Sequence, residues 1–407
     1  MTNGIVSLIK QSFPHVFLLG ILTLALSCSP QSLVTEKLDP GEYPVKNKVD
    51  FGLDHNPTFA IYGDSQVGWR ARETFMQKRN WRGWRLLAAP YWFAQGVIGG
   101  INAMRHVPDW GVKERRMMRE AILDYHQQSP VDFVFGMGDF VTDGRRANEW
   151  QRFLKENREE TPFINSIPLV PLNGNHEHVT DSAFGEPNYK AIFEYPLFYK
   201  LEFPDAAVFV LHSGFLVDQY LDIPDSVQNQ LFKTWFIAEA NSEKPGWLEK
   251  ELVTCEKNFK IVALHHPPVS FGKHHVDWFN QSFGPDLPGK LKQLIELFHR
   301  TGVQLILAGH EHHYERSELI SGDSRIQVLV SGGGGVPLRD VLSRTNVENY
   351  TKNYNDLGIG VRSVIQSKDF HYGIIQVEKE KMTIEVFQVE KGERDHTLLD
   401  SLSISSL

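Results

Sequence analysis

Five apolar segments of strand length, each followed by glycine or polar residues, constrain the fold of this chain more than any other feature of its sequence. They occupy residues 58–62, 131–135, 167–172, 260–264 and 303–308. Each segment is apolar on both faces, as strands buried beneath helices are. Helical patterns separate several of them, over residues 113–128, 227–240 and 289–300. This alternation indicates an α/β fold.

The pattern changes after residue 325, where we expect strands without helices between them. The expected strands cover residues 326–331, 372–377 and 382–389. Only residues 378–381 separate the last two, which predicts a hairpin.

The residues that follow the five apolar segments carry oxygen and nitrogen donors. They are Asp64, Asp139, Asn175, His265 and His310, with His312 two places further along. In open α/β sheets, ligands bind outside the carboxyl ends of the strands, so we expect these side chains to converge. Zinc, manganese and iron prefer such donors. The sequence therefore predicts a metal site at this edge.

The same residues stand in short blocks whose order is informative. The blocks are Gly63-Asp64, Gly138-Asp139, Gly174-Asn175-His176-Glu177, His265 and Gly309-His310-Glu311-His312, which runs on through His313 into Tyr314-Glu315-Arg316. From Asp64 to Arg316 they resemble the calcineurin-like metallophosphoesterase family, and within it the purple acid phosphatase branch. The resemblance implies a sandwich of two mixed β-sheets flanked by helices. It also implies hydrolysis of a phosphate ester by water activated between two metal ions.

The resemblance gives a role to each matching residue. Asp139 would bridge the two metal ions, while Asp64 and His312 would bind the first. The second ion would be bound by Asn175, His265 and His310. We expect divalent or trivalent ions of iron, manganese or zinc.

Two histidines are the expected catalytic residues. His176 follows the metal-binding Asn175 and would stabilise charge on phosphate or protonate the leaving group. His275 stands ten places after His265, where the purple acid phosphatases have a further active-site histidine. In contrast, we expect the Tyr314-Glu315-Arg316 block to support the ligand loop without touching substrate.

Two positions depart from the family pattern. Gln66 stands where most of the wider family has a metal-binding histidine, so either its amide oxygen coordinates weakly or it hydrogen-bonds water at the metal. Thr142 stands where the purple branch has the tyrosine that causes its colour. We therefore expect a colourless enzyme whose first metal is held less tightly.

The N-terminus has the features of an export signal. Lys10 is the only charged residue before position 36, and an apolar run covers residues 16–26. This run is shorter than the roughly 20 residues that span a bilayer and suits a signal peptide. It ends at Cys28 in a segment that resembles the lipobox of bacterial lipoproteins, although Ala25 and Ser27 depart from its commonest form. An ordinary cut after Ser27 is the alternative.

These observations divide the chain into segments. We expect a signal peptide over residues 1–27, a lipidated Cys28 with a polar tether over 28–57, a metallophosphoesterase domain over 58–395 and a C-terminal tail over 396–407. The protein would be an exported, membrane-anchored bacterial lipoprotein that faces the periplasm or the cell surface. The only other cysteine is Cys255, which excludes a disulfide framework.

An insertion over residues 69–110 is rich in tryptophan and, in its first half, in arginine. We favour a lid or extra helical layer with buried tryptophans, and a membrane-facing surface is the alternative. The net charge of −8 argues against a nucleic-acid-binding protein, which carries a basic surface.

The function expected from the sequence is hydrolysis of small-molecule phosphate esters, with phosphomonoesters as the first choice. A phosphodiesterase acting on nucleotides or lipid head groups is the second. A non-catalytic binding lipoprotein is a third reading, supported mainly by Gln66. We expect the membrane to be reached through the N-terminal lipid and no obligate protein partner.

Overall fold

The computed structural model describes residues 45–49, 52–68, 111–178, 182–217, 224–238, 245–390 and 396–406. The expected signal peptide, Cys28 and the whole insertion over 69–110 lie outside these residues. Within them, no helix combines the length and apolar character that crossing a bilayer requires.

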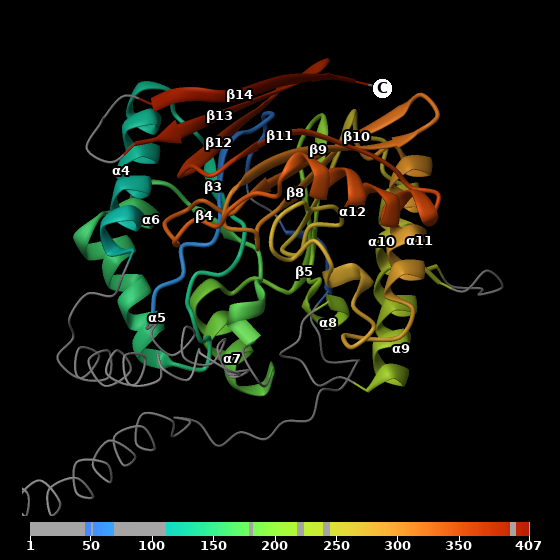
Figure 1. The fold of residues 1–407 in the computed structure, drawn as a ribbon. Helices are drawn as coiled ribbons and strands as arrows, with labels where there is room; N and C mark the ends of the chain where they lie inside the picture. Colours follow the sequence, from blue (N-terminus) through green and yellow to red (C-terminus); the bar gives the residue numbers. More distant parts are fainter. Residues whose placement is uncertain are drawn as a thin grey trace, which may run out of the picture. The chain divides into compact units, whose positions relative to one another are not determined.

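Two mixed sheets form the centre of the fold (Figure 1). The six-stranded sheet has the order β14 (His396–Ser405), β13 (Lys381–Val389), β12 (His371–Val377), β2 (Thr58–Tyr62), β3 (Phe133–Gly136) and β4 (Leu169–Pro171). The eight-stranded sheet has the order β1 (Val45–Val49), β5 (Phe198–Glu202), β6 (Ala206–Leu211), β7 (Phe259–Leu264), β8 (Leu305–Ala308), β10 (Ser324–Ser331), β9 (Tyr314–Ser321) and β11 (Gly360–Ser367). Strands β2, β3 and β4 are parallel, as are β6, β7, β8 and β10.

Helices cover the outer faces of the sheets (Figure 1). Beside the six-stranded sheet lie α4 (Val112–Gln128) and α6 (Phe163–Ser166), and beside the eight-stranded sheet lie α9 (Asp225–Trp235), α10 (Trp247–Val253) and α11 (Leu287–Thr301). The other helical segments are α5 (Ala147–Leu154), η2 (Lys155–Glu160), η3 (Asn175–His178), α7 (Ser182–Phe193), α8 (Gly214–Val217), η4 (Asp277–Phe279) and α12 (Arg344–Asp356).

The alternation of side chains along β2 shows how the layers are filled. Phe59 and Ile61 point between the sheets and join the central core, whereas Ala60 and Tyr62 pack under α4 and α6. Successive strand residues point to opposite faces, so an apolar strand can serve both cores. This explains why the predicted strands carry apolar residues on both faces.

Local sequence signals set the ends of α11. The Asp286 side chain caps the helix by accepting the backbone N–H of Gly289 at 3.2 Å, and Pro288 lies in the first turn. Gly302 ends the helix in a left-handed conformation with φ 72°. These are the residues that helix starts and stops favour.

Three expectations about segments need correction. Residues 396–405 are not a tail, because they form the edge strand β14, which pairs antiparallel with β13. The tether expected over residues 28–57 contains β1, which pairs in parallel with β5. Helices do not stop after residue 325, because α12 begins at Arg344 behind an N-cap at Ser343.

Candidate metal centre

The five predicted strand ends meet at one edge shared by both sheets. Asp64, Asp139 and Asn175 follow β2, β3 and β4 of the six-stranded sheet, whereas His265 and His310 follow β7 and β8 of the eight-stranded sheet. Backbone hydrogen bonds join neighbouring loops, including Asp64 N to the Gly138 carbonyl at 3.1 Å.

Three of the candidate ligands have left-handed backbones. The φ angles are 58° at Asp64, 56° at Asp139 and 71° at His310, and each residue follows a glycine. A left-handed conformation costs a non-glycine residue roughly 1–2 kcal/mol. The surrounding loops must hold these residues in place to offset that cost.

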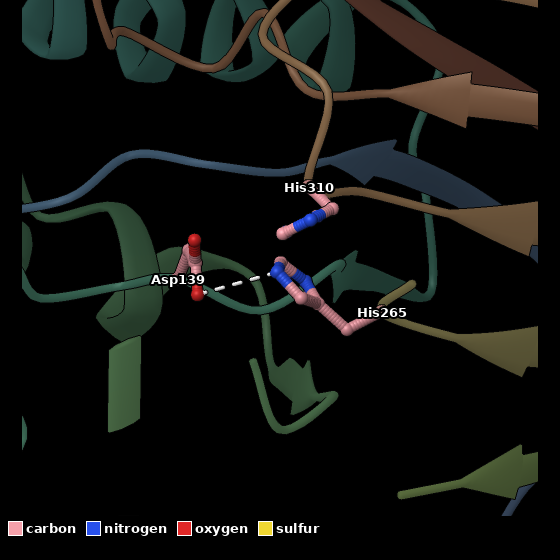
Figure 2. Close-up of side chains that lie close together, drawn as sticks. All are labelled: Asp139, His265 and His310. Atoms are coloured by element: carbon pink, nitrogen blue, oxygen red, sulfur yellow. Dashed lines mark ion pairs between the residues drawn. The ribbon is translucent and has the colours of Figure 1, made fainter. Parts of the chain in front are cut away.

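The candidate ligands Asp64, Asp139, Asn175, His265, His310 and His312 form a cluster, in which Asp139 faces His265 and His310 (Figure 2). One carboxylate oxygen of Asp139 is 3.3 Å from Nε2 of His265. Donor atoms of Asp139, His265 and His310 all lie within 4.8 Å of one another, and all three residues are buried. This spacing is small enough for one cation to contact all three side chains.

The Asn175 amide oxygen closes this half of the cluster. It is 3.0 Å from Nε2 of His265 and 3.1 Å from Nδ1 of His310. Nδ1 of His265 donates to the Met137 carbonyl at 2.8 Å, which directs Nε2 to the cluster. Two imidazoles and an amide oxygen therefore point at one another beside Asp139.

Asp64 and His312 form the other half. Nε2 of His312 is 3.8 Å from Oδ1 of Asp64, and Nδ1 of His312 donates to the Pro337 carbonyl at 3.2 Å. The second oxygen of Asp64 accepts the backbone N–H of His310 at 2.9 Å. Gly332 passes so close that a side chain there would collide with the Glu311 carbonyl.

Gln66 is placed as a supporting residue. Its amide nitrogen donates to Oδ2 of Asp139 at 2.8 Å, and the residue is buried. In this orientation Gln66 offers the cluster a donor N–H. Gln66 is therefore a hydrogen-bond partner of the Asp139 carboxylate. This role differs from the weak metal coordination by its amide oxygen that the sequence suggested.

His176 faces the cluster from the side of Asp139. Its Nε2 is 3.9 Å from the Asp139 carboxylate, and its Nδ1 donates to the Thr142 carbonyl at 2.7 Å. The bond to Thr142 fixes the ring and leaves Nε2 toward the cluster. This is the position that a proton donor or phosphate-binding group would need.

The second expected catalytic histidine is placed differently. His275 donates from Nδ1 to the Gly272 carbonyl at 2.7 Å and packs on Tyr350, with ring centroids 3.6 Å apart. Its neighbour His274 lies beside the cluster instead, with its ring centroid 4.2 Å from that of His310. The geometry therefore favours His274 over His275 as the histidine near the reacting atoms.

Asp277 is a member of the site that the sequence patterns did not indicate. One oxygen of Asp277 is 3.0 Å from Nε2 of His310 and 3.4 Å from Nδ1 of His274. Burial would raise the pKa of Asp277, but the hydrogen bonds from His274 and His310 outweigh it and lower that pKa. Asp277 follows no predicted strand, so its only local signal is its spacing three places after His274.

Two buried glutamates support the ligand loops. Glu177 accepts backbone N–H groups from both Gly174 and Asp139, at 2.8 and 3.0 Å. Glu311 accepts the Lys273 and His274 N–H groups at 3.0 and 2.6 Å. Both glutamates belong to motif blocks of the sequence, but a role was expected only for the neighbouring asparagine and histidines of these blocks.

The side chains of the Tyr-Glu-Arg block bond to β14 and to the loop at Phe271. Asp400 on β14 accepts two bonds from Arg316, at 2.6 and 2.9 Å, and one from the Tyr314 hydroxyl at 2.7 Å. Glu315 accepts the Phe271 N–H at 2.9 Å. These bonds join the two sheets and support the loop at Phe271.

The buried charges of the cluster perturb one another. Burial, opposed by His265 and aided by Asp139, raises the pKa of Asp64 well above its usual range. Burial would also raise the pKa of Asp139, but His265 and His176 outweigh it and hold that pKa low. Burial opposes protonation of His265, yet the charge of Asp139 raises the pKa of His265 to about 10. The cluster therefore attracts positive charge, which a metal ion would supply while displacing protons.

The donor set fits metal ions. Burial lowers the pKa of His310 to about 4, so its ring is neutral near pH 7 and carries one proton. With that proton on Nε2, facing the Asp277 carboxylate, Nδ1 and the Asn175 oxygen would be two acceptors 3.1 Å apart. Asp64 Oδ1 is buried without a hydrogen-bond partner among the described residues. One cation beside His310 Nδ1 and the Asn175 oxygen, and another beside Asp64 Oδ1, would give these acceptor atoms a partner.

Comparison with known families agrees with this chemistry. The sequence profile of the calcineurin-like phosphoesterases matches residues 105–314, which is a little over half of the 407 residues. The chain belongs to the calcineurin-like phosphoesterase family. The matched region carries every candidate metal ligand except Asp64 and the possible ligand Gln66.

Several curated relatives of this phosphoesterase chain are acid phosphatases. Acid phosphatase type 7 of Homo sapiens is 28% identical over 274 residues, which cover 62% of this chain and 52% of the relative. Tartrate-resistant acid phosphatase type 5 of Sus scrofa is 25% identical over 217 residues, covering 50% of this chain and 58% of the relative. The chain thus spans about half the length of the relatives that it matches.

Solved structures share the fold. A purple acid phosphatase from yellow lupin seeds superimposes with a TM-score of 0.55 at 16% identity, covering 89% of this chain and 55% of the lupin chain. The Plasmodium protein GAP50 gives 0.52 at 11% identity, covering 87% and 90%. These similarities confirm the expected sandwich of two mixed sheets flanked by helices.

Proposed function

We propose that this chain hydrolyses phosphate esters, with phosphomonoesters as its substrates, using two metal ions held by the cluster. The observation that carries the proposal is that donor atoms of Asp139, His265 and His310, which follow three strands drawn from both sheets, all lie within 4.8 Å of one another. Asn175 would complete the ligands of one ion, and Asp64 and His312 those of the other. When bound, the two ions would neutralise phosphate charge and activate water for attack.

His176 and His274 would act on the phosphate from two sides. His176 approaches the cluster beside Asp139, and His274 approaches it beside His310. Both rings keep some exposure to solvent, at 9% and 20% of the side chain, whereas His265 has none. The partly exposed rings can reach a ligand, and a protonated imidazole can bond a phosphate oxygen or protonate the leaving group.

The preference for monoesters is supported by the acid phosphatases among the relatives. Hydrolysis of diesters, on nucleotides or lipid head groups, would use the same metal ligands. Gln66 was the main sequence feature in favour of the alternative, a non-catalytic binding protein. Because Gln66 supports Asp139 in the cluster, its presence does not weaken the proposal.

The proposal is tested by assaying the full chain with an aryl phosphate and an aryl phosphodiester, with manganese, zinc or iron added. We expect faster turnover of the monoester and a loss beyond 100-fold in Asp139→Asn, since outer-shell changes alone cost about 10–100-fold. Asp323→Asn is the matched control, because Asp323 is exposed in the turn between β9 and β10. Metal content is measured for each variant.

Each outcome separates the candidates. Faster turnover of the diester would replace the monoesterase by a phosphodiesterase. Bound metal without turnover of either ester would favour the binding protein. Full activity in Asp139→Asn would contradict the site itself.

A further inference from the structure

The candidate ligand His310 differs from the other two imidazoles in how its ring is held. His265 and His312 each donate from Nδ1 to a backbone carbonyl, which leaves Nε2 toward the cluster. His310 has the opposite arrangement, because its Nε2 bonds a side-chain carboxylate, that of Asp277, at 3.0 Å. Its Nδ1 is the atom that faces Asn175.

A neutral imidazole carries one ring proton, and the partner of one nitrogen decides where that proton lies. An ionised carboxylate can only accept, so the contact with Asp277 requires the proton on Nε2. The lone pair of Nδ1 is then directed at the cluster. If the proton moved to Nδ1, it would occupy the place where a cation must bind.

We propose that Asp277 is a positioning residue that holds His310 in the tautomer presenting Nδ1 to the second metal ion. This inference rests on the dinuclear centre proposed above and adds a residue to it. Carboxylates that accept the far N–H of a metal-binding histidine fix its tautomer and raise its basicity. Asp277 would therefore strengthen one of the two metal sites without touching the ion.

The packing around Asp277 is suited to this role. Its carboxylate keeps only 13% exposure, so the bond to His310 is largely protected from water. Asp277 is the first residue of the short helix η4, in which Trp278 donates from its indole to the Pro267 carbonyl at 2.8 Å. This bond ties η4 to the loop that begins at His265, so the acceptor of His310 is fixed to the neighbouring ligand.

His274 supplies a competing arrangement that the experiment must separate. It contacts the same Asp277 oxygen, and donor atoms of His274, Asp277 and His310 also lie within 4.8 Å of one another. A cation bound by those three groups would occupy Nε2 of His310. The ring proton would then lie on Nδ1, and His310 could not bind an ion of the dinuclear centre. Metal stoichiometry distinguishes the two arrangements.

The test titrates metal-free full-length protein with Mn²⁺ and, separately, Zn²⁺ by calorimetry. We expect two sites in the unmodified protein and a 10–100-fold loss of affinity at one of them in Asp277→Ala. Asp277→Asn should lose less, because its amide oxygen can still accept. His274→Ala should keep both sites, and Asp323→Asn is the control for loss of a carboxylate.

A second readout does not depend on metal. Nitrogen-15 NMR of histidine-labelled, metal-free protein should show His310 protonated at Nε2, with a shift toward Nδ1 in Asp277→Ala. The proposal would be overturned if both metal affinities were unchanged in Asp277→Ala, or if the His310 tautomer were unchanged in that variant. It would also be overturned if the unmodified protein bound a third ion that His274→Ala did not bind. If the unmodified protein bound metal at two sites but hydrolysed no ester, the proposed function would fail while the role of Asp277 stood.

Discussion

Replacing Glu177 should loosen the loop that carries Asp139. The Glu177 carboxylate is fully buried and accepts backbone N–H groups from Gly174, Phe140 and Asp139 at 2.8, 2.9 and 3.0 Å. Asp139 needs that support because its backbone is left-handed. In Glu177→Ala the three N–H groups lose their acceptor, and the loop can relax.

The size of the effect follows from these bonds. Each buried N–H left without a partner costs about 1–3 kcal/mol, so three cost about 3 kcal/mol at the low end, where water partly replaces the carboxylate. Glu177→Gln keeps one acceptor oxygen and should cost about half as much. Burial and the charge of Asp139 raise the pKa of Glu177 to about 7, so the carboxylate is ionised at pH 8.

The assay is urea unfolding at pH 8 in the presence of a chelator, followed by circular dichroism. Glu159→Ala is the control, because Glu159 is exposed at the end of η2. Metal affinity, measured separately, should fall in step with stability across Glu177→Gln and Glu177→Ala. A loss below about 1 kcal/mol in Glu177→Ala would refute the claim that these bonds hold the loop.

Two further predictions concern the sheets. Asp400→Ala leaves the Arg316 guanidinium and the Tyr314 hydroxyl without their shared acceptor, and we expect a loss of about 3 kcal/mol in urea unfolding, with Asp323→Ala unchanged. A loss no larger than the control would show that the link between β9 and β14 contributes nothing. Burial lowers the pKa of His371 to about 4, so below pH 6.5 the unfolded chain binds a proton that the folded chain does not. His371 should therefore account for about 3 kcal/mol of the fall in stability from pH 6.5 to pH 4, so the stability of His371→Gln should fall by about that much less than the stability of the unmodified chain; an identical pH dependence in this variant would contradict the assignment.

The sequence predicted the centre of the fold because burial on both faces leaves a clear pattern. Strand β2 was predicted over the residues that it occupies, and the expected hairpin joins β12 and β13, with Glu378 N bonded to the Lys381 carbonyl at 2.8 Å. Since parallel strands present their carboxyl ends at one edge, the positions of the metal-binding side chains followed from the strands.

Elements at the edges were harder to predict. Strand β14 pairs with β13 along its length, but its side chains are exposed or half-buried and polar residues interrupt its apolar ones. An edge strand with one solvated face lacks the continuous apolar run that marks a central strand. Helix α12 buries only Tyr354, so it too leaves a weak apolar pattern.

The supporting residues of the site depend on contacts between distant parts of the chain. Asp277 meets His310 across 33 positions, and nothing in the loop around Asp277 indicates that contact. His274 and His275 are adjacent and chemically identical, so spacing alone could not choose between them. The turn after Gly272 decides, because Glu311 fixes the His274 backbone.

The split of the candidate ligands between the two sheets has a consequence for folding. One sheet contributes the carboxylates and the amide, and the other contributes the imidazoles, so neither layer alone holds a complete coordination shell. A cation would therefore bind tightly only after the layers have docked. An ion that binds the docked sheets but not the separated sheets shifts the folding equilibrium toward the native chain. Metal binding would therefore also stabilise the packing of the two sheets against each other.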